Sequence, residues 1–588
     1  MTDPIAGNDA GHPARVRLSR HRLSRLRAMR ASVSVCSLTS LVLAFVGASI
    51  AGADEPPPAP PPDPARQAAD AEVNAESPLT VELDSGAVRG RADDATRQFL
   101  GIPYAAAPVG DLRWQPPHSV PHWDGIRDAT EPEARCTQTM MMPTGSLDSG
   151  SMQPGEQPAD EPSEDCLYLN VTTPRDAAAD APLPVMVWWH GGGFTTGAGS
   201  EYDAARMADQ GNVIVVTVNY RLGVFGYFGL PGLPGSGNFG LADQFASLEW
   251  AQRNAGAFGG DPDSVTVFGE SAGGMSTCAA LTSPRAEGLI DKAIISSGSC
   301  MLEWPAGTQY PSSQAETPYI DVEQDRADGL ALAREMGCRD DVLACMRDKP
   351  ADELLPHTQD FANHLAYGTD LLPVDPADAL AAGEVADAPV ISGGNRDEGR
   401  AFVAGAIMHD PTTITPLTYT GLLQRAFEGD AGKVAGRYPM EQYGSAALAW
   451  ATVVTDATWA CPTRRGEHML ARRGPTYAYE FADPNAPNVN LSWVPQFPMG
   501  AAHATDLPYI FDLGGRNMLA PGGQQDLARR MIGYWTSFAH SGDPNHEGAP
   551  HWAPIEPDSG ATLQLAPGAV GPVDNAAVHN CRFWDGLE

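Results

Sequence analysis

Lysine is nearly absent from this sequence, which has only Lys292, Lys349 and Lys433. The 38 basic side chains are therefore mostly arginine, and 73 acidic side chains outnumber them. The formal net charge of −35 excludes the basic surface on which nucleic-acid binding depends. The same charge repels anionic membranes. We therefore expect neither a nucleic acid nor a stable membrane partner, and the sequence carries no signal of the oligomeric state.

Metal-binding cysteine motifs are also lacking. None of the nine cysteines has the C-x-x-C spacing of a zinc site, so the sequence predicts no metal centre. One of them, Cys36, lies in an N-terminal segment that we expect to be removed. The other eight form an even number, as expected of a disulfide-bonded exported protein.

Charged residues are missing from residues 31–53, directly after an arginine-rich segment. This run ends in A-G-A at residues 51–53, the small-residue pattern of a signal-peptidase site. We interpret residues 1–53 as a cleaved signal peptide and predict a secreted protein, extracellular or periplasmic. The run is nearly long enough to span a bilayer, so an uncleaved anchor is the alternative. Met29 is an alternative start.

Proline and acidic residues dominate the next segment. The sequence PPPAPPPDP at residues 56–64 favours an extended spacer, and we predict a disordered linker over residues 54–78. The folded domain is expected over residues 79–588. It begins with a segment that reads as a hairpin around residues 84–86, and the Met- and Pro-rich residues 137–163 read as a surface loop.

The body of the chain alternates apolar runs with helical patterns, such as the one over residues 241–254. Continuous apolar runs are typical of strands that are buried on both faces, so the sequence predicts an α/β fold with a mainly parallel central sheet. Active sites of such sheets lie at the carboxyl ends of the strands. The expected strands are residues 184–189, 212–220, 264–268, 292–298 and 388–394.

One serine lies where such a strand meets a helix. Residues 269–273 read G-E-S-A-G, which fits the G-x-S-x-G turn that lifts a nucleophilic serine above a sheet. Larger residues at Gly269 and Gly273 are expected to clash across this turn. Ser271 is therefore the candidate nucleophile, and the helix that follows directs its N-terminal N–H groups at the site.

A serine nucleophile needs hydrogen-bond donors for the oxyanion that forms when it attacks a carbonyl group. The motif HGGGF at residues 190–194 follows the strand 184–189 directly, and consecutive glycines leave backbone N–H groups accessible. We assign the oxyanion hole to the N–H groups of Gly192, Gly193 and Ala272.

The base and its orienting acid are expected in the order serine, acid, histidine. His503 lies in a loop of small residues before an aromatic segment, which leaves its ring free to reach a pocket. Glu398 follows the predicted strand that begins at residue 388, at the strand end where a triad acid is required. Its neighbour Asp397 fits this position equally well by composition.

Beyond these residues, the chain from about Leu79 onward resembles the type-B carboxylesterase family, which includes carboxylesterases, cholinesterases and bacterial p-nitrobenzyl esterases. This resemblance implies an α/β-hydrolase fold, with Ser271 as nucleophile, His503 as base and Glu398 rather than Asp397 as acid. The motifs that carry it are FLGIPYAAAPVGDLRW (99–114), SEDCLYLNV (163–171), HGGGF (190–194), NYRLGVFGYF (219–228), GNFGLADQFASLEW (237–250), FGGDPDSVTVFGESAGG (258–274), SGGNRDEG (392–399) and CRFWDGL (581–587).

The resemblance also implies supporting residues around the site. Glu270 matches the usual glutamate beside the nucleophile, Ser297 a serine that supports the triad, and Trp304 an aromatic residue of the acyl pocket. Phe194 of the HGGGF motif is expected at the same pocket. The expected disulfides are Cys136–Cys166, Cys338–Cys345 and Cys461–Cys581, with Cys278–Cys300 formed by the two cysteines that remain.

The chain departs from the cholinesterases in the loop between Cys136 and Cys166. Cholinesterases carry a choline-binding tryptophan there, whereas this loop contains methionines and no aromatic residue. We therefore expect a secreted, cofactor-free hydrolase of small-molecule esters, short- to medium-chain or bulky and uncharged. The alternatives are a lipase or amidase with the same triad, and a non-catalytic binding protein of the same fold.

Overall fold

We describe a computed structural model of the chain over residues 79–139, 161–490, 492, 494–557 and 560–587. All of these residues belong to one compact unit, Asp63–Glu588. The predicted signal peptide and linker, and most of the loop 137–163, lie outside the described residues. None of the described helices is both long enough and apolar enough to span a membrane.

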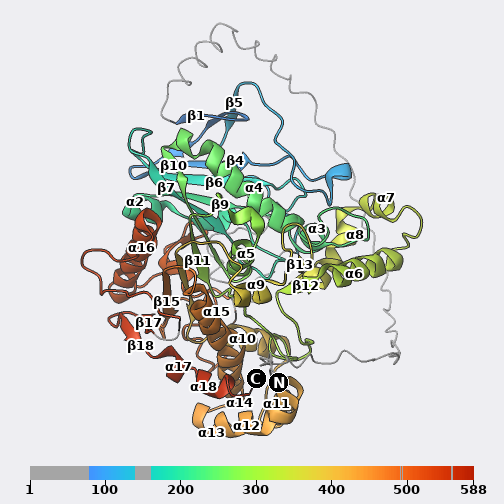
Figure 1. Cartoon of the computed structure of the whole chain (residues 1–588), viewed down its shortest axis with the longest axis vertical. Helices are drawn as coiled ribbons and strands as arrows, with labels where there is room; N and C mark the ends of the chain where they lie inside the picture. The colour runs from blue at the N-terminus through green and yellow to red at the C-terminus, as the bar shows by residue number, and fades with distance from the viewer. Residues whose placement is uncertain (1–78, 140–160, 491, 493, 558–559, 588) are drawn as a thin grey trace, which may run out of the picture. The chain divides into compact units, whose positions relative to one another are not determined.

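The core is a twisted sheet to which the described residues contribute eleven strands (Figure 1). The strands from β17 to β9 run parallel, and the strands at both edges run antiparallel, which confirms the predicted mainly parallel sheet. The order is β18 (Gly571–Val573), β17 (Thr562–Leu565), β15 (Thr476–Phe481), β14 (Val390–Asn395), β11 (Lys292–Ser296), β10 (Gly260–Glu270), β7 (Leu183–Trp189), β9 (Ile214–Val218), β6 (Tyr168–Pro174), β4 (Thr96–Pro103) and β3 (Arg91–Ala92).

The five predicted strands are present as β7, β9, β10, β11 and β14, with shifted ends. Strand β10 is longer than expected, because it begins at Gly260 and runs to the residue before Ser271. The expected N-terminal hairpin is also present: β1 (Thr80–Leu83) pairs antiparallel with β2 (Gly86–Arg89). Strand β5 (Ile126–Asp128) joins β2 on its other side, and two short pairs, β12 (Tyr319–Asp321) with β13 (Leu365–Tyr367) and β8 (Tyr202–Asp203) with β16 (Asp512–Leu513), lie outside the main sheet.

Side chains of the central strands alternate between two apolar layers, as the two-residue repeat of a strand requires. On β7, Met186 and Trp188 pack in the layer that contains α2 (Ala205–Gly211) and α16 (Gly523–Ser541). Val187 and Trp189 pack in the opposite layer, which contains α4 (Phe239–Asn254) and α5 (Ala272–Leu281). Both faces of the sheet are therefore covered, which explains the uninterrupted apolar runs in its strands.

The other helices lie in the connections between strands, apart from α17 (Asn575–Val578) and α18 (Cys581–Trp584), which follow the last strand. Three helical segments follow one another without a break: α14 (Ala446–Val454), a π-helical turn (Thr455–Ala460) and α15 (Cys461–Leu470). The remaining helices are α3 (Gly223–Tyr227), α6 (Val322–Glu335), α7 (Val342–Arg347), α8 (Ala351–Leu354), α9 (Pro376–Ala382), α10 (Gly399–His409), α11 (Tyr419–Phe427), α12 (Ala431–Arg437) and α13 (Met440–Tyr443).

Four disulfides join the eight cysteines of the described residues in the pairs that we expected. Cys278–Cys300 ties α5 to the segment after β11, and Cys461–Cys581 ties the start of α15 to α18 across a sequence separation of 120 residues. The other pairs are Cys136–Cys166 and Cys338–Cys345. Such a set of bridges is typical of proteins that mature in an oxidising compartment.

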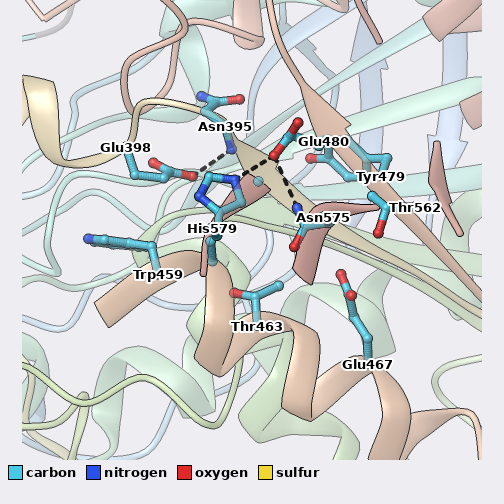
Figure 2. Close-up of a pocket in the computed structure, with 13 residues that line it drawn as sticks. Asn395, Glu398, Trp459, Thr463, Glu467, Tyr479, Glu480, Thr562, Asn575 and His579 are labelled. Carbon is cyan, nitrogen blue, oxygen red and sulfur yellow. Dashed lines mark hydrogen bonds and ion pairs between the residues drawn. The ribbon is translucent and has the colours of Figure 1, made fainter. Parts of the chain in front are cut away.

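A buried histidine reinforces the attachment of the C-terminal segment. The Nδ1 atom of His579 lies 2.7 Å from Asp456 Oδ1. Its Nε2 atom lies 2.6 Å from Glu480 Oε1 (Figure 2). Burial lowers the pKa of His579, but the two carboxylates raise it by more, to about 10. The imidazolium therefore neutralises two acids on different elements, the π-helical turn and β15.

We predict that His579→Gln lowers the free energy of unfolding by about 3 kcal/mol at pH 6, because removing one partner of a buried ion pair leaves Asp456 uncompensated, while Glu480 keeps its pair with Arg396. Below pH 6.5 the histidine is protonated in both the folded and the unfolded chain, so its contribution is complete. Between pH 6.5 and about 10 only the folded chain holds the proton, and the contribution falls progressively.

Urea titrations at pH 6, 8 and 10 measure the difference between wild type and variant, with the exposed His551 changed to glutamine as the matched control. The difference should shrink as pH rises for His579→Gln and stay near zero for His551→Gln. A difference that is constant over this range would show that the His579 charge contributes nothing to stability.

Candidate active site

Ser271 forms the turn between β10 and α5. Its backbone has φ 55° and ψ −121°, a conformation that residues other than glycine rarely adopt. Two hydrogen bonds hold it there: Ser271 N donates to Ser296 O at 3.0 Å, and Met275 N donates to Ser271 O at 2.8 Å. The turn therefore places the serine at the carboxyl edge of the sheet, one residue after the strand ends.

The glycines around Ser271 are required by close backbone contacts. A Cβ atom on Gly269 would lie 2.5 Å from the carbonyl carbon of Gly273, across the turn as we expected. A Cβ atom on Gly273 would instead lie 1.9 Å from the carbonyl oxygen of Trp189, at the end of β7. The second glycine thus lets α5 approach the neighbouring strand.

The structure brings Ser271, His503 and Glu398 into one hydrogen-bonded chain. His503 Nε2 lies 2.8 Å from Ser271 Oγ, and His503 Nδ1 lies 2.6 Å from Glu398 Oε2. The exposed fractions of the histidine and glutamate are 7% and 2%. The three residues come from the ends of β10 and β14 and from the loop after β15, so the sheet edge gathers segments that are far apart in the sequence.

The two adjacent acids, Asp397 and Glu398, face different partners. Glu398 Oε1 accepts hydrogen bonds from Ser297 Oγ at 2.5 Å and from Asn395 N at 2.7 Å, so both of its carboxylate oxygens are held in place. Asp397 instead forms an ion pair with Arg400 at 2.8 Å and accepts from the Ala501 N–H. Only Glu398 contacts the histidine.

Glu270 lies on the serine side of the same histidine. Its Oε1 atom is 3.4 Å from His503 Nε2 and has no hydrogen-bond partner among the described residues. Burial raises the pKa of Glu270 to about 8. Burial also lowers the pKa of His503, but the nearby carboxylates of Glu270 and Glu398 raise it by more, so the net shift is upward.

The glycine motif after β7 presents backbone N–H groups near this chain of residues. Gly192 and Gly193 are exposed and have positive φ angles of 106° and 61°. Within the described residues, no acceptor pairs with the N–H groups of Gly192, Gly193 or Ala272. Phe194, by contrast, is completely buried, and its ring packs on Tyr227, so its side chain belongs to the core.

Two aromatic rings pack against the histidine. Trp459 and Phe402 have ring centroids 4.7 and 5.1 Å from that of His503. Trp304 packs on Trp459 at 5.9 Å. The sequence analysis missed Phe402 and Trp459. Phe402 lies four residues after Glu398, one turn along α10, and this spacing could have identified it. Trp459 lies in a π-helical turn, which the sequence pattern does not predict.

A small polar cavity lies beside Glu398 (Figure 2). Its volume is about 20 Å³, which accommodates about one water molecule and no substrate. Asn395, Tyr479 and His579 line it together with Glu398. The cavity is thus lined both by Glu398 and by the buried ion cluster around His579. No group of three or more potential metal ligands occurs in the part of the chain that the structure describes.

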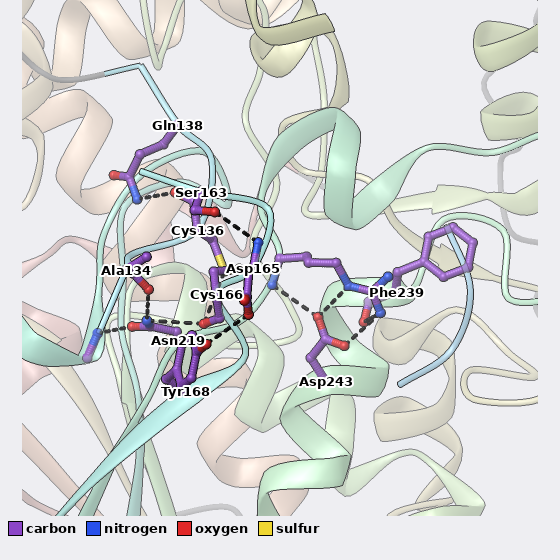
Figure 3. The surroundings of a disulfide bond; sticks show 12 residues. Ala134, Cys136, Gln138, Ser163, Asp165, Cys166, Tyr168, Asn219, Phe239 and Asp243 are labelled. Carbon is purple, nitrogen blue, oxygen red and sulfur yellow. Dashed lines mark hydrogen bonds and ion pairs between the residues drawn. A yellow bond between two sulfur atoms is a disulfide. The ribbon is translucent and has the colours of Figure 1, made fainter. Parts of the chain in front are cut away.

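The loop that we compared with that of cholinesterases is firmly attached at both ends (Figure 3). Asn219 Nδ2 donates to the carbonyl oxygens of Ala134 and Cys166, at 3.1 and 3.2 Å, on either side of the Cys136–Cys166 disulfide. Gln138 donates to the carbonyl oxygen of Cys136 at 2.9 Å. These contacts fix the two ends of a loop that contains no aromatic residue.

Comparison with known proteins identifies the family. The profile of the Carboxylesterase family matches residues 77–584. Cocaine esterase from Homo sapiens is 32% identical over 522 residues, covering 84% of this chain and 87% of that protein. Para-nitrobenzyl esterase from Bacillus subtilis is 35% identical over 505 residues, covering 82% and 94%. A medium-chain fatty acyl-CoA hydrolase precursor from Anas platyrhynchos is 33% identical over 516 residues, covering 82% and 88%.

This match extends over nearly all of the described residues and agrees with both the sheet topology and the motifs in the sequence. It confirms the predicted α/β-hydrolase fold and ester hydrolysis as the activity. The chain belongs to the carboxylesterase family and is a carboxylic-ester hydrolase.

Proposed function

We propose that this protein is an exported serine carboxylesterase that cleaves small uncharged esters through a covalent acyl-enzyme. The observation that carries the proposal is the continuous hydrogen-bonded chain from Ser271 Oγ through His503 to Glu398. Neither carboxylate oxygen of Glu398 is free to turn away, because Ser297 and Asn395 hold one while His503 engages the other.

In the first step, Ser271 Oγ attacks the ester carbonyl carbon while His503 Nε2 accepts the hydroxyl proton. Glu398 keeps Nδ1 protonated, so that Nε2 is the free acceptor, and its charge stabilises the imidazolium that forms. The carbonyl oxygen becomes an oxyanion, for which Gly192, Gly193 and Ala272 supply N–H donors. Collapse of this intermediate expels the alcohol, which leaves with the proton from His503.

The second step repeats this chemistry with water. His503 takes a proton from a water molecule, whose oxygen attacks the acyl carbon, and the carboxylic acid departs as Ser271 recovers its proton. Every proton in the cycle is carried by the same Nε2 atom. The pair of Ser271 and His503 therefore works as one unit.

The substrate class follows from the surroundings of this unit. Trp304, Trp459 and Phe402 form an apolar aromatic cluster beside His503, which suits uncharged acyl groups. The loop between Cys136 and Cys166 offers no aromatic ring for a quaternary ammonium group, and its methionines favour varied apolar groups. The name of the Bacillus relative, para-nitrobenzyl esterase, also points to uncharged esters as the first compounds to test. Export is supported by the four disulfides.

Ser271→Ala should lower kcat for a short p-nitrophenyl ester by about four to six orders of magnitude, because the nucleophile and base act together. The variant should also lose the burst of p-nitrophenol that marks acyl-enzyme formation, while its melting temperature stays close to that of the wild type. Wild-type protein without a burst and without turnover would favour a non-catalytic binding protein of this fold. Near-normal turnover by the variant would refute the assignment of Ser271.

Glu398→Gln and Asp397→Asn form a matched pair of neighbouring amide substitutions. Glu398→Gln removes the charge that faces His503 and should reduce kcat by about three to four orders of magnitude. Asp397→Asn loosens only the partly exposed pair with Arg400, so we expect less than a tenfold effect. Steady-state kinetics at pH 8 compare the two. The reverse ranking would identify Asp397 as the acid.

Neutral short-chain esters should have a kcat/KM at least about tenfold higher than that of acetylcholine, since no aromatic platform in the Cys136–Cys166 loop captures the cation. The measurement compares acetylcholine with an uncharged acetate ester of similar size, and a long-chain triglyceride tests the lipase alternative. Equal turnover of the first two esters would contradict the argument from the loop. Preference for the triglyceride would favour a lipase.

A further inference from the structure

The π-helical turn Thr455–Ala460 contacts His503 of the proposed triad and the residue next to Glu398. Thr455 Oγ1 accepts a hydrogen bond at 2.9 Å from the N–H of Gly399, the residue after Glu398. Four residues later, the indole of Trp459 lies against the His503 ring. Single π-turns cost helical regularity and often occur at functional sites. This turn therefore contacts the base of the proposed triad directly, through Trp459, and holds the backbone next to the acid through Thr455.

Trp459 is held rigidly in this position. Its ring is stacked on Phe402, with centroids 5.4 Å apart and planes inclined by 13°, and it packs on Trp304 at 5.9 Å. Only 3% of the residue is exposed. The indole and the His503 ring have centroids 4.7 Å apart and planes inclined by 48°, and this separation is inside the range of about 6 Å over which an aromatic ring attracts a cation.

We propose that Trp459 is a positioning residue for the base: its indole ring stabilises the imidazolium form of His503 relative to the neutral form. The proposal rests on the proposed function, in which His503 gains a proton in each half of the reaction. The quadrupole of the indole interacts more strongly with a cation than with a neutral ring. A contact that strengthens as the charge develops lowers the barrier rather than merely tightening substrate binding.

The acidic groups that face His503 come from three elements and remain in place when Trp459 is changed. They are Glu270 at the end of β10, Glu398 after β14 and the buried Asp506 in the segment of His503 itself. Replacing tryptophan by leucine keeps the neighbourhood apolar, so the substitution removes the indole without adding a charge and leaves the Phe402 ring in contact with His503. The pKa of His503 in the Trp459→Leu variant should therefore report on the indole.

The experiment measures kcat/KM for a short p-nitrophenyl ester from pH 5 to pH 9.5 in wild type, Trp459→Leu and Trp459→Phe. Trp459→Leu should lower the apparent pKa of the acidic limb by about 0.5 to 1.5 units, and it should lower kcat in the plateau several-fold. Trp459→Phe restores an aromatic face and should recover most of both effects.

Trp304→Leu is the matched control, because Trp304 belongs to the same buried cluster and packs on Trp459, while the rings in contact with His503 are Trp459 and Phe402. It should change the preference for acyl length but leave the apparent pKa within about 0.2 units of wild type. If Trp459→Leu fails to fold, Trp459→Met, which keeps a long apolar side chain, takes its place in the same comparison.

An unshifted apparent pKa in Trp459→Leu, or a change in KM alone, would overturn the proposal and leave Trp459 as a wall of the acyl pocket. An equal shift in Trp304→Leu would also overturn it. These outcomes are distinct from a failure of the proposed function, which would appear as persistent activity of Ser271→Ala.

Discussion

A single close approach between two elements of the sheet underlies this active site. The backbone of Gly273 passes so near the carbonyl group of Trp189 that no side chain fits between them. Because α5 can approach the end of β7 at this point, the turn between β10 and α5 can be sharp, and Ser271 stands clear of the sheet. The same approach brings the first N–H group of α5 toward the glycine motif that follows β7. The positions of the proposed nucleophile and of the proposed oxyanion donors thus depend on the missing Cβ atom of Gly273.

Two buried histidines show how partners decide whether such a side chain is structural or reactive. Both ring nitrogens of His579 face carboxylates, so the ring is held as a permanent cation. His503 has a carboxylate on one nitrogen and a hydroxyl group on the other. A hydroxyl can give up its proton, so this ring can change its charge during a reaction. Both imidazoles have a raised pKa, and it is the geometry of their partners that separates their roles.

The sequence predicts those parts of the site whose residues lie close together in the sequence. Each of three local patterns spans about ten residues or fewer: the strand before Ser271, the glycines beside it and the HGGGF motif. The structure has all three where the pattern predicts them. Asp397 and Glu398 could not be separated by composition, because they differ only in the direction in which the start of α10 turns each side chain. The resemblance to the family selected Glu398, and this is the acid that contacts His503.

Contacts between distant segments were not predictable in this way. Trp459 contacts His503 although β15 lies between the two residues in the sequence. It also lies in a π-helical turn, whose residues per turn differ from those of an α-helix. The ion cluster of His579 joins side chains separated by 99 and 123 residues. Phe194 was expected at the pocket because of its motif, but the chain turns its ring toward Tyr227. In each of these cases tertiary packing, rather than local pattern, sets the position.

The ion cluster of His579 also bears on the order in which parts of the enzyme can form their contacts during synthesis. Ser271, Glu398 and His503 all precede His579 in the sequence, and therefore leave the ribosome before it. Yet Asp456, on the turn that carries Trp459, obtains its counter-charge from His579, and Glu480, on the strand beside β14, pairs with both His579 and Arg396. Until that residue has been synthesised and Cys581 can bond to Cys461, Asp456 lacks its cation. The groups of the proposed triad are therefore synthesised early, whereas the contacts of their surroundings are complete only once the segment around residues 575–584 has been synthesised.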